Sequence, residues 1–529
     1  MMTRHDGVTV RGEDYLPAGP TVLPEDTRYA DLRTGNNVRF VATPEYVRLI
    51  NSAEDARLAV QAAADTGKRV SVRSGGHCFA DFVSNPEVEV ILDISTLTDV
   101  SYDADMRAFL VEPGARLLQV YERLFKGWGV TIPGGICYSV GAGGHIAGGG
   151  YGLLSRSFGL VVDHLYAVEV VTLDVHGRAS LTRATRDSRG ALGDLWWAHT
   201  GGGGGNYGVV TKYWFRSPSA EGETPEHQLV HAPSRVLVSA LSYSWDDLTE
   251  RDFCRLMDNW GAWHEEFRHP GLPETALSSL FNLNHRAHGS IDIFSQIDAN
   301  APDAAGILER FQTRMAEDVR CEAGAMNAPG GVLPALPQFA QTREISWLQA
   351  TRTVGADNPI ITDPSSRGAH KSAYFKKRFT RAQLSVLWQR LGDPEFTNPN
   401  TMLVLFSFGG AVNAVPKTAT ANVQRDSIFK ICLQTFWRER EDDGLYLSWA
   451  RSTYQELFSD SGGVPVPGDQ VDGCYINYPD TDMADPRFNN SGVAWFQLYH
   501  QGNYARLQRA KKRWDPTNFF THTLGVELP

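Results

Sequence analysis

One stretch of the chain, residues 133–152, limits the possible folds more than any other. It contains nine glycines around a single cysteine, Cys137. A backbone with so few Cβ atoms can approach a flat or anionic ligand closely and can adopt positive φ angles where needed. We therefore predict that a large ligand lies against this glycine belt.

Two further glycine-rich segments have the same character. A strand expected at residues 68–73 leads from Arg73 directly into Ser74, Gly75, Gly76 and His77, a transition that can present backbone N–H groups to phosphate oxygens. A tight turn explains this segment equally well. Residues 201–205 are five consecutive glycines between an aromatic segment and a strand, which favours a ligand-facing loop over a flexible linker.

At 529 residues the chain is expected to form two domains. The composition changes to small and charged residues at 217–226, the clearest candidate boundary. Helices and strands alternate without a repeat, which indicates an α+β protein with an antiparallel sheet in its second domain. We predict a discontinuous first domain of residues 1–216 and 475–529 and a second domain of residues 217–474, with the chain before residue 40 as an extended arm.

Charge and apolar patterning narrow the class of partner. The formal net charge is −11, so the chain has no overall positive charge that would attract nucleic acid or an anionic membrane. A small-molecule substrate is therefore favoured. The N-terminus lacks the apolar region of a secretory signal, and no apolar run approaches the roughly 20 residues that span a bilayer. We expect a soluble, cytoplasmic protein.

Several common cofactor and metal patterns are missing from the sequence. The six cysteines include no C-x-x-C pair, so neither a disulfide framework nor a zinc site is predicted, and no metal site is visible. No G-x-G-x-x-G fingerprint or P-loop lysine follows the expected strands, which argues against a dehydrogenase that uses NAD.

Five motifs follow one another in a fixed order along the chain. They are R-S-G-G-H at 73–77, P-G-G-x-C at 133–137, G-G-G-Y-G-x-x-S-R-x-F-G at 148–159, the glycine loop at 201–208 and Y-x-N-Y-x-D at 475–480. Together they resemble those of the berberine-bridge-enzyme-like flavin oxidases, over nearly the whole chain. Within that group the chain looks most like the actinomycete oxidases of natural-product sugars and alcohols, such as the hexose oxidase of glycopeptide-antibiotic pathways. The resemblance implies a two-domain α+β fold of the PCMH/vanillyl-alcohol-oxidase (VAO) type that binds FAD.

The same resemblance implies FAD held by two covalent bonds, one from His77 and one from Cys137. Both bonds need an unprotonated nucleophile against an electron-poor ring, which an imidazole nitrogen and a thiolate supply. A turn histidine and a buried inert thiol are the alternatives for these two residues. The remaining residues expected at the cofactor, either at its pyrophosphate or near its ring, are Arg73, Ser74, Gly75, Gly76, Gly141, Gly143, Gly144, Gly149, Gly150 and Asn477.

An alcohol oxidase also needs a base that takes the hydroxyl proton while hydride leaves the same carbon. By resemblance the Y-x-N-Y motif supplies it, and we expect Tyr478 as the base with Tyr475 as its neighbour. On a strand these two would point to opposite faces, so that only one need enter the site. Tyr151 and Tyr374 are candidate assisting tyrosines, with an ordinary buried tyrosine as the equal alternative for each.

The predicted function is an FAD oxidase that converts a sugar hydroxymethyl or secondary alcohol of a natural product to an aldehyde, ketone or acid. Dioxygen would reoxidise the flavin and give hydrogen peroxide. Two alternatives are flavin-dependent oxidative cyclisation and a flavin-containing protein that binds a metabolite without turnover. The sequence leaves the substrate and the choice between monomer and homodimer open.

Overall fold

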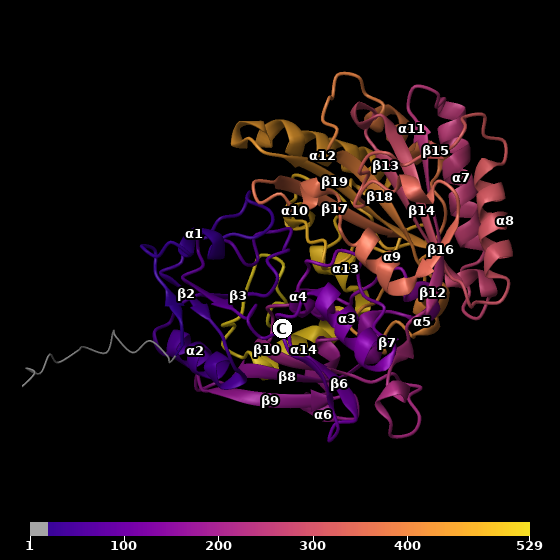
Figure 1. Cartoon of the computed structure of the whole chain (residues 1–529). Helices are drawn as coiled ribbons and strands as arrows, with labels where there is room; N and C mark the ends of the chain where they lie inside the picture. The colour runs from indigo at the N-terminus through magenta and orange to yellow at the C-terminus, as the bar shows by residue number, and fades with distance from the viewer. Residues whose placement is uncertain (1–18) are drawn as a thin grey trace, which may run out of the picture.

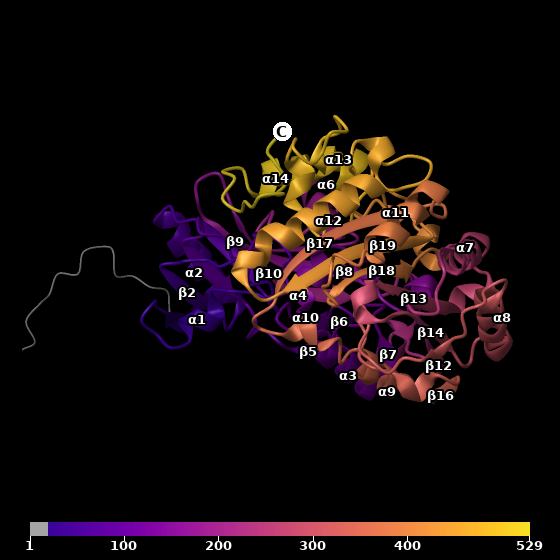
Figure 2. The same cartoon turned by 90° about the horizontal axis from the view of Figure 1, so that it is seen from above.

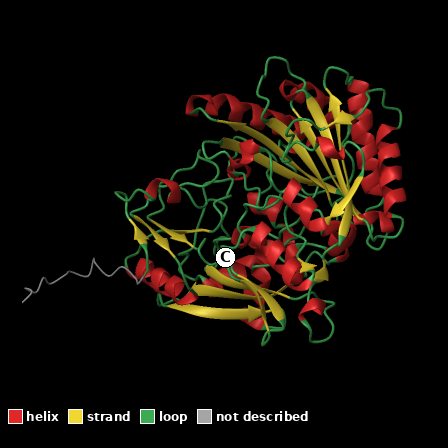
Figure 3. Cartoon of the chain, viewed as in Figure 1, coloured by secondary structure: helices red, strands yellow, loops and turns green. Residues whose placement is uncertain are grey.

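The computed structural model of the chain describes residues 19–529 and contains three main sheets (Figures 1 and 3). Two smaller sheets belong to the N-terminal half, and the largest sheet is built from residues between 235 and 437. No helix among the described residues is long and apolar enough to cross a membrane. Part of the expected extended arm, residues 1–18, lies outside the described residues, and the segment that follows contains β1 (Thr21–Val22) and α1 (Tyr29–Leu32).

The first small sheet carries the first glycine turn. Its strand order is β1-β2-β4-β3, with β2 (Tyr46–Leu49), β3 (Val70–Arg73) and β4 (Val90–Asp93) parallel to one another. Helix α2 (Ala53–Asp65) begins at Ser52, whose hydroxyl accepts a hydrogen bond from the Asp55 amide at 3.0 Å, as the capping pattern predicts. Its small apolar face packs between this sheet and the next.

The second small sheet is antiparallel and has five strands in the order β5-β6-β10-β8-β9. Helix α3 (Leu117–Trp128) packs beside it and ends at Gly129, which has a φ of 69°. The glycine belt then folds as a loop, the short helix α4 (Ala142–Ala147) and a second loop that leads to α5 (Ser155–Phe158). The five strands are β5 (Val100–Asp103), β6 (Ala108–Val111), β8 (Leu165–Leu173), β9 (Ala179–Thr185) and β10 (Val209–Phe215).

The large sheet has eight antiparallel strands in the order β15-β12-β14-β13-β18-β19-β17, with β16 paired to β12 beside β15. The expected α+β class is therefore confirmed, as is the antiparallel sheet expected for the later part of the chain. The strands are β12 (Arg235–Ser244), β13 (Leu277–Asn284), β14 (Ser290–Asp298), β15 (Gly324–Ala325), β16 (Arg343–Ser346), β17 (Arg367–Phe375), β18 (Thr401–Ser407) and β19 (Phe429–Trp437).

Helices cover the outer face of this sheet, while its inner face turns toward the N-terminal half (Figure 1). The covering helices are α7 (Glu250–Glu266), α8 (Ala304–Ala316), α11 (Arg381–Leu391) and α12 (Asp443–Leu457). Side chains of a strand alternate between its faces, so residues 430, 432, 434 and 436 of β19 share one face. Gln434 and Phe436 border the cavity described below, which assigns this face to the interior.

The last 55 residues return to the N-terminal half, as Figure 2 shows for α13 (Trp495–Tyr499) and α14 (Tyr504–Trp514). Helix α14 packs against α6 (Gly190–Ala198), and the buried Lys511 of α14 donates to the carbonyl of Asn206 at 2.8 Å. Near the expected boundary at residue 217, the chain still pairs with the N-terminal half through β11 (Val230–His231) and β7 (Val130–Thr131). The large sheet begins four residues later.

Candidate functional site

A long cavity runs between the N-terminal half and the inner face of the large sheet. Its walls are the two glycine segments at 74–77 and 135–144, the loop at 203–208, the turn at 475–479 and side chains of β13, β17, β18 and β19. Helices α9 (Trp347–Val354) and α10 (Pro359–Thr362) flank the loop that closes one side. The cavity thus gathers residues from the beginning, middle and end of the chain.

The two glycine segments touch back to back. A Cβ atom placed on Gly75 would lie 2.3 Å from the backbone nitrogen of Gly141, and one on Gly141 would lie 2.4 Å from that of Gly75. The Ser74 hydroxyl fixes the contact by donating to the carbonyl of Pro113 at 2.6 Å. Only glycine permits this approach, which holds two stretches of backbone amides along one wall of the cavity.

Most of the glycines expected at the cofactor border this cavity, but two do not. Ser74, Gly75, Gly76, Gly141, Gly143, Gly144 and Asn477 line it, as does Arg73, which pairs with the buried Asp93 at 2.6 Å. Gly149 and Gly150 face protein instead: their hypothetical Cβ atoms would meet Asn422 and Val161. The expected ligand-facing loop does border the cavity, with positive φ at Gly203 and Gly205.

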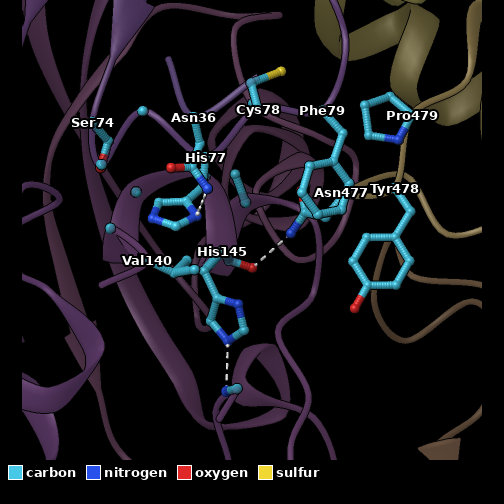
Figure 4. A pocket seen from close by; sticks show the side chains of 18 of the residues that line it. Asn36, Ser74, His77, Cys78, Phe79, Val140, His145, Asn477, Tyr478 and Pro479 are labelled. Atoms are coloured by element: carbon cyan, nitrogen blue, oxygen red, sulfur yellow. Dashed lines mark hydrogen bonds between the residues drawn. The ribbon is translucent and has the colours of Figure 1, made fainter. Parts of the chain in front are cut away.

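His77 lies at the cavity in a defined tautomer (Figure 4). The Asn36 amide nitrogen, 3.4 Å from Nδ1 of His77, also donates to the carbonyl of Ile361, so Nδ1 is the acceptor. Nε2 is then the protonated nitrogen and donates to the hydroxyl of Ser139 at 3.1 Å. Burial and, to a lesser extent, the positive charges of Arg116 and Arg73 lower the pKa of His77 to about 4. At neutral pH the imidazole is uncharged, and among the described residues the lone pair of Nδ1 accepts only the long hydrogen bond from Asn36.

Cys137 lies beside the same hydroxyl. Its sulfur is 3.4 Å from Oγ of Ser139, so one side chain contacts both expected attachment residues. Burial, together with the nearby Asp357 carboxyl, raises the pKa of the Cys137 thiol to about 12. The thiol is therefore protonated at neutral pH and needs a proton acceptor before it can act as a nucleophile.

The strand expected for the Y-x-N-Y motif is wrong. Residues 475–478 form a turn, closed by a hydrogen bond from the Tyr478 amide to the Tyr475 carbonyl at 2.9 Å. The turn places both rings at the cavity with their centroids 5.1 Å apart. Asn477 within it donates to the carbonyl of His145 at 3.1 Å and to the Tyr475 hydroxyl at 3.3 Å, which ties the turn to α4.

Three of the four predicted tyrosines meet at the cavity. The hydroxyls of Tyr151 and Tyr478 are hydrogen-bonded to each other, and the Tyr475 hydroxyl accepts from the amide of Gly150 at 3.2 Å. Burial raises the pKa of Tyr151 and Tyr478 well above its usual range, and that of Tyr475 to about 12. Tyr374 is fully buried behind Tyr475, with ring centroids 6.1 Å apart, and does not border the cavity.

Lys430 of β19 lies among these rings, and the sequence analysis missed it. Its Nζ is 2.8 Å from the ring centroid of Tyr151, 3.8 Å from that of Tyr475 and 4.7 Å from that of Tyr478. The residue is fully buried, and its amine has no hydrogen-bond partner among the described residues. Burial lowers its pKa well below the usual range. A lysine inside a largely apolar strand was the signal that could have indicated it.

Part of the cavity lining is aromatic, with a few free polar atoms. The rings of Phe79 and His370 stack 3.7 Å apart, and Phe79 also lies 5.4 Å from Tyr478. Among residues 19–529, both ring nitrogens of His370 and Oε1 of Gln434 are buried without a hydrogen-bond partner. Such a wall can hold a ring-shaped ligand and hydrogen-bond to its polar groups.

These features fit FAD. Two glycine segments expose backbone amides for a pyrophosphate, and no side chain could occupy the place where they meet. The neutral imidazole of His77 and the sulfur of Cys137 border the same space, with the tyrosine cluster facing it across the cavity. Asn36, Ser139 and Asp357, which also line or support this region, carried no recognisable pattern in the sequence.

Comparison with known proteins agrees with this assignment. A family model described as "FAD binding domain" matches residues 44–176, and one described as "Berberine and berberine like" matches residues 474–527. The aclacinomycin-N/aclacinomycin-A oxidase of Streptomyces galilaeus is 45% identical over 95% of this chain and 89% of its own length. The hexose oxidase of Chondrus crispus is 33% identical over 95% of this chain and 93% of its own.

Comparison with solved structures shows that the similarity covers the whole fold. The glycopeptide hexose oxidase DBV29, solved with teicoplanin, superposes with a TM-score of 0.89 at 42% identity, covering 97% of this chain and 99% of its own. CrmK, a flavoenzyme of caerulomycin biosynthesis, gives a TM-score of 0.90 at 40% identity, covering 96% and 99%. With its glycine-lined cavity, its tyrosine turn and these relatives, the chain belongs to the berberine-bridge-enzyme-like FAD-linked oxidoreductases.

Proposed function

We propose that this protein is an oxidase that holds FAD through His77 and Cys137 and oxidises a hydroxyl group of a sugar or another natural product. The observation that carries the proposal is the cluster of Tyr151, Tyr478 and Lys430, which faces the two nucleophiles across one cavity. The bound flavin supplies the hydride acceptor, and dioxygen serves as the final oxidant. Relatives named as oxidases of aclacinomycins and of hexoses support this reaction class.

Tyr478 is the proposed base. It is half-buried and borders the cavity, whereas Tyr151 behind it is 8% exposed. A neutral phenol cannot take a proton, so the base must first become a phenolate, which burial alone disfavours. The hydrogen bond with Tyr151 and the amine of Lys430 stabilise that phenolate.

The two attachments are proposed on the chemistry of their side chains. Nδ1 of His77 carries the lone pair, since Nε2 donates to Ser139. Cys137 touches the same hydroxyl and supplies the second nucleophile once it loses its proton. Two tethers would fix the ring against the glycine segments and the tyrosine turn, which keeps the reacting atoms in one geometry.

The substrate class follows from the aromatic part of the cavity lining. The stacked pair of Phe79 and His370 suits a sugar face or an aromatic aglycone, and the free polar atoms of His370 and Gln434 suit hydroxyl groups. A hydroxymethyl or secondary alcohol of a glycosylated or polyketide metabolite satisfies both requirements. A role in antibiotic or secondary-metabolite biosynthesis follows from the same substrate class.

The experiment combines colour retention with turnover. Wild-type protein precipitated with acid should keep its yellow colour, as should His77→Ala and Cys137→Ala alone, while the double variant should release FAD. Hydrogen peroxide release is then screened against sugars, glycopeptides and polyketide alcohols. Tyr478→Phe should keep the flavin but reduce it with substrate about 10²-fold to 10⁴-fold more slowly.

Three results would contradict the proposal. Release of FAD from the acid-precipitated wild type would refute the two covalent bonds. An unchanged rate in Tyr478→Phe would remove the base and favour a binding protein without turnover. A product that has only lost hydrogen and has gained a ring would indicate the alternative reaction, oxidative cyclisation.

A further inference from the structure

Asp357 is a strained and buried residue that the reaction proposed above does not use. It lies in the loop between α9 and α10, borders the cavity, and has a φ of 60°, in the left-handed region that non-glycine residues rarely adopt. Only 3% of it is exposed, and neither carboxyl oxygen has a hydrogen-bond partner among residues 19–529. A buried carboxyl without a partner costs stability, and such strain is concentrated at functional sites.

The surrounding loop is fixed, so the position of Asp357 is not accidental. A Cβ atom on Gly355 would lie 2.6 Å from the carbonyl oxygen of Ile136, which means that the loop packs directly on the segment carrying Cys137. On the other side, the Asn358 side chain accepts from the amide of Ile360 at 3.2 Å and donates to the carbonyl of Gly331 at 3.1 Å.

The Asp357 carboxyl and the Cys137 thiol border the same cavity, on two segments that pack against each other. The carboxyl raises the pKa of the thiol, and the thiol in turn lowers that of the carboxyl. The contact is not a well-aligned hydrogen bond, since both carboxyl oxygens lack a partner of hydrogen-bonding geometry. Ser139 also contacts the sulfur, but a hydroxyl is a much weaker proton acceptor than a carboxylate.

We propose that Asp357 is the proton acceptor that activates Cys137 for its own attachment to the flavin. This rests on the covalent link through Cys137 proposed above. The chain would thus catalyse its own modification with a carboxylate supplied by the loop between α9 and α10, whereas His77 already presents an unprotonated Nδ1. Burial raises the pKa of Asp357 to about 7, so both the carboxylate and its acid are accessible near neutral pH.

The atoms and electrons of this step balance with dioxygen as oxidant. The S–H bond of Cys137 breaks and its proton passes to the Asp357 carboxylate. The sulfur forms a bond to a ring carbon of the flavin, that carbon loses its hydrogen as a proton, and the ring system accepts the electron pair. Dioxygen takes up the two electrons and two protons as hydrogen peroxide, which restores the oxidised flavin and the Asp357 carboxylate.

Asp357→Asn is the sharpest test, because asparagine has the same shape and tolerates the same left-handed backbone. The holoenzyme is digested with trypsin and its flavin-bearing peptides are weighed. Cleavage gives residues 74–107 with His77 and residues 127–156 with Cys137, so two tethers join both peptides through one FAD. In the wild type we expect the joined species, and in Asp357→Asn at least a tenfold smaller fraction of it, with FAD on the His77 peptide alone.

Two further variants separate this proposal from the one on which it rests. Asp357→Gly, which also tolerates the backbone but leaves no side chain, should lose the Cys137 link like Asp357→Asn, while retained FAD on His77 shows that both variants fold. A joined fraction in Asp357→Asn equal to that of the wild type, or loss of both links, would overturn the role of Asp357. A wild type without any link to Cys137, like Cys137→Ala, would instead refute the covalent bond itself.

Discussion

Replacing Lys430 with methionine is expected to slow catalysis without weakening the fold. When the buried Lys430 amine takes up a proton as Tyr478 ionises, the resulting ammonium lies 4.7 Å from the centre of the Tyr478 ring. At an effective dielectric constant of about 20, a unit charge at that distance stabilises the phenolate by about 3.5 kcal/mol, or about 2.5 pKa units. Loss of that charge raises the pKa of the base and slows flavin reduction by up to about 400-fold. Because the tyrosine must be deprotonated, the rate in Lys430→Met should recover only at higher pH.

The stability of Lys430→Met should stay the same as that of the wild type or increase. The Lys430 amine is buried without a hydrogen-bond partner among the described residues, and methionine has a similar length without a polar amine to desolvate. We therefore expect the free energy of unfolding to stay constant or rise by about 1–3 kcal/mol.

The assay is anaerobic flavin reduction by substrate in a stopped-flow instrument across a pH series, together with thermal unfolding of the holoenzyme. Lys377→Met, which removes the same charge from an exposed position on the same domain, is the matched control and should behave as the wild type. An unchanged reduction rate and pH profile in Lys430→Met would refute the electrostatic role of this lysine. A large loss of thermal stability would refute the argument that its buried amine is an unfavourable element of the fold.

Three further substitutions test other parts of the structure. Gly75→Ala places a Cβ 2.3 Å from the nitrogen of Gly141, so we expect a displaced loop and a free energy of unfolding that is lower by at least about 1–3 kcal/mol. The displaced loop should also lower the ratio of flavin to protein absorbance. In the wild type the buried Asp515 carboxylate lies 2.6 Å from the Lys511 amine. Lys511→Met removes this cation and should lower the free energy of unfolding, measured in urea, by about 3–5 kcal/mol. Tyr374→Phe should change the turnover rate less than threefold, since the ring does not border the cavity; a large loss would return Tyr374 to the list of catalytic candidates.

The sequence by itself determined the class of fold and the family. Local pattern located single elements, as for the strand expected at residues 68–73, which the structure contains as β3 (Val70–Arg73). The glycine belt, the turn after β3 and the Y-x-N-Y motif identified an FAD-linked oxidase because each motif reflects a requirement of the backbone or of the flavin rather than of packing. The expected roles of His77 and Cys137 remain predictions, although both line one cavity.

Only the tertiary structure decided which residues act together. Tyr475 and Tyr478 both face the cavity because their segment is a turn, which the spacing i, i+3 could not distinguish from a strand. Lys430 and Asp357 reach the site from the middle of the chain, where nothing in the local sequence indicates a distant partner. The physical reason is that a buried charge or a strained residue is recognised by what surrounds it, and those surroundings come from segments hundreds of residues apart in the chain.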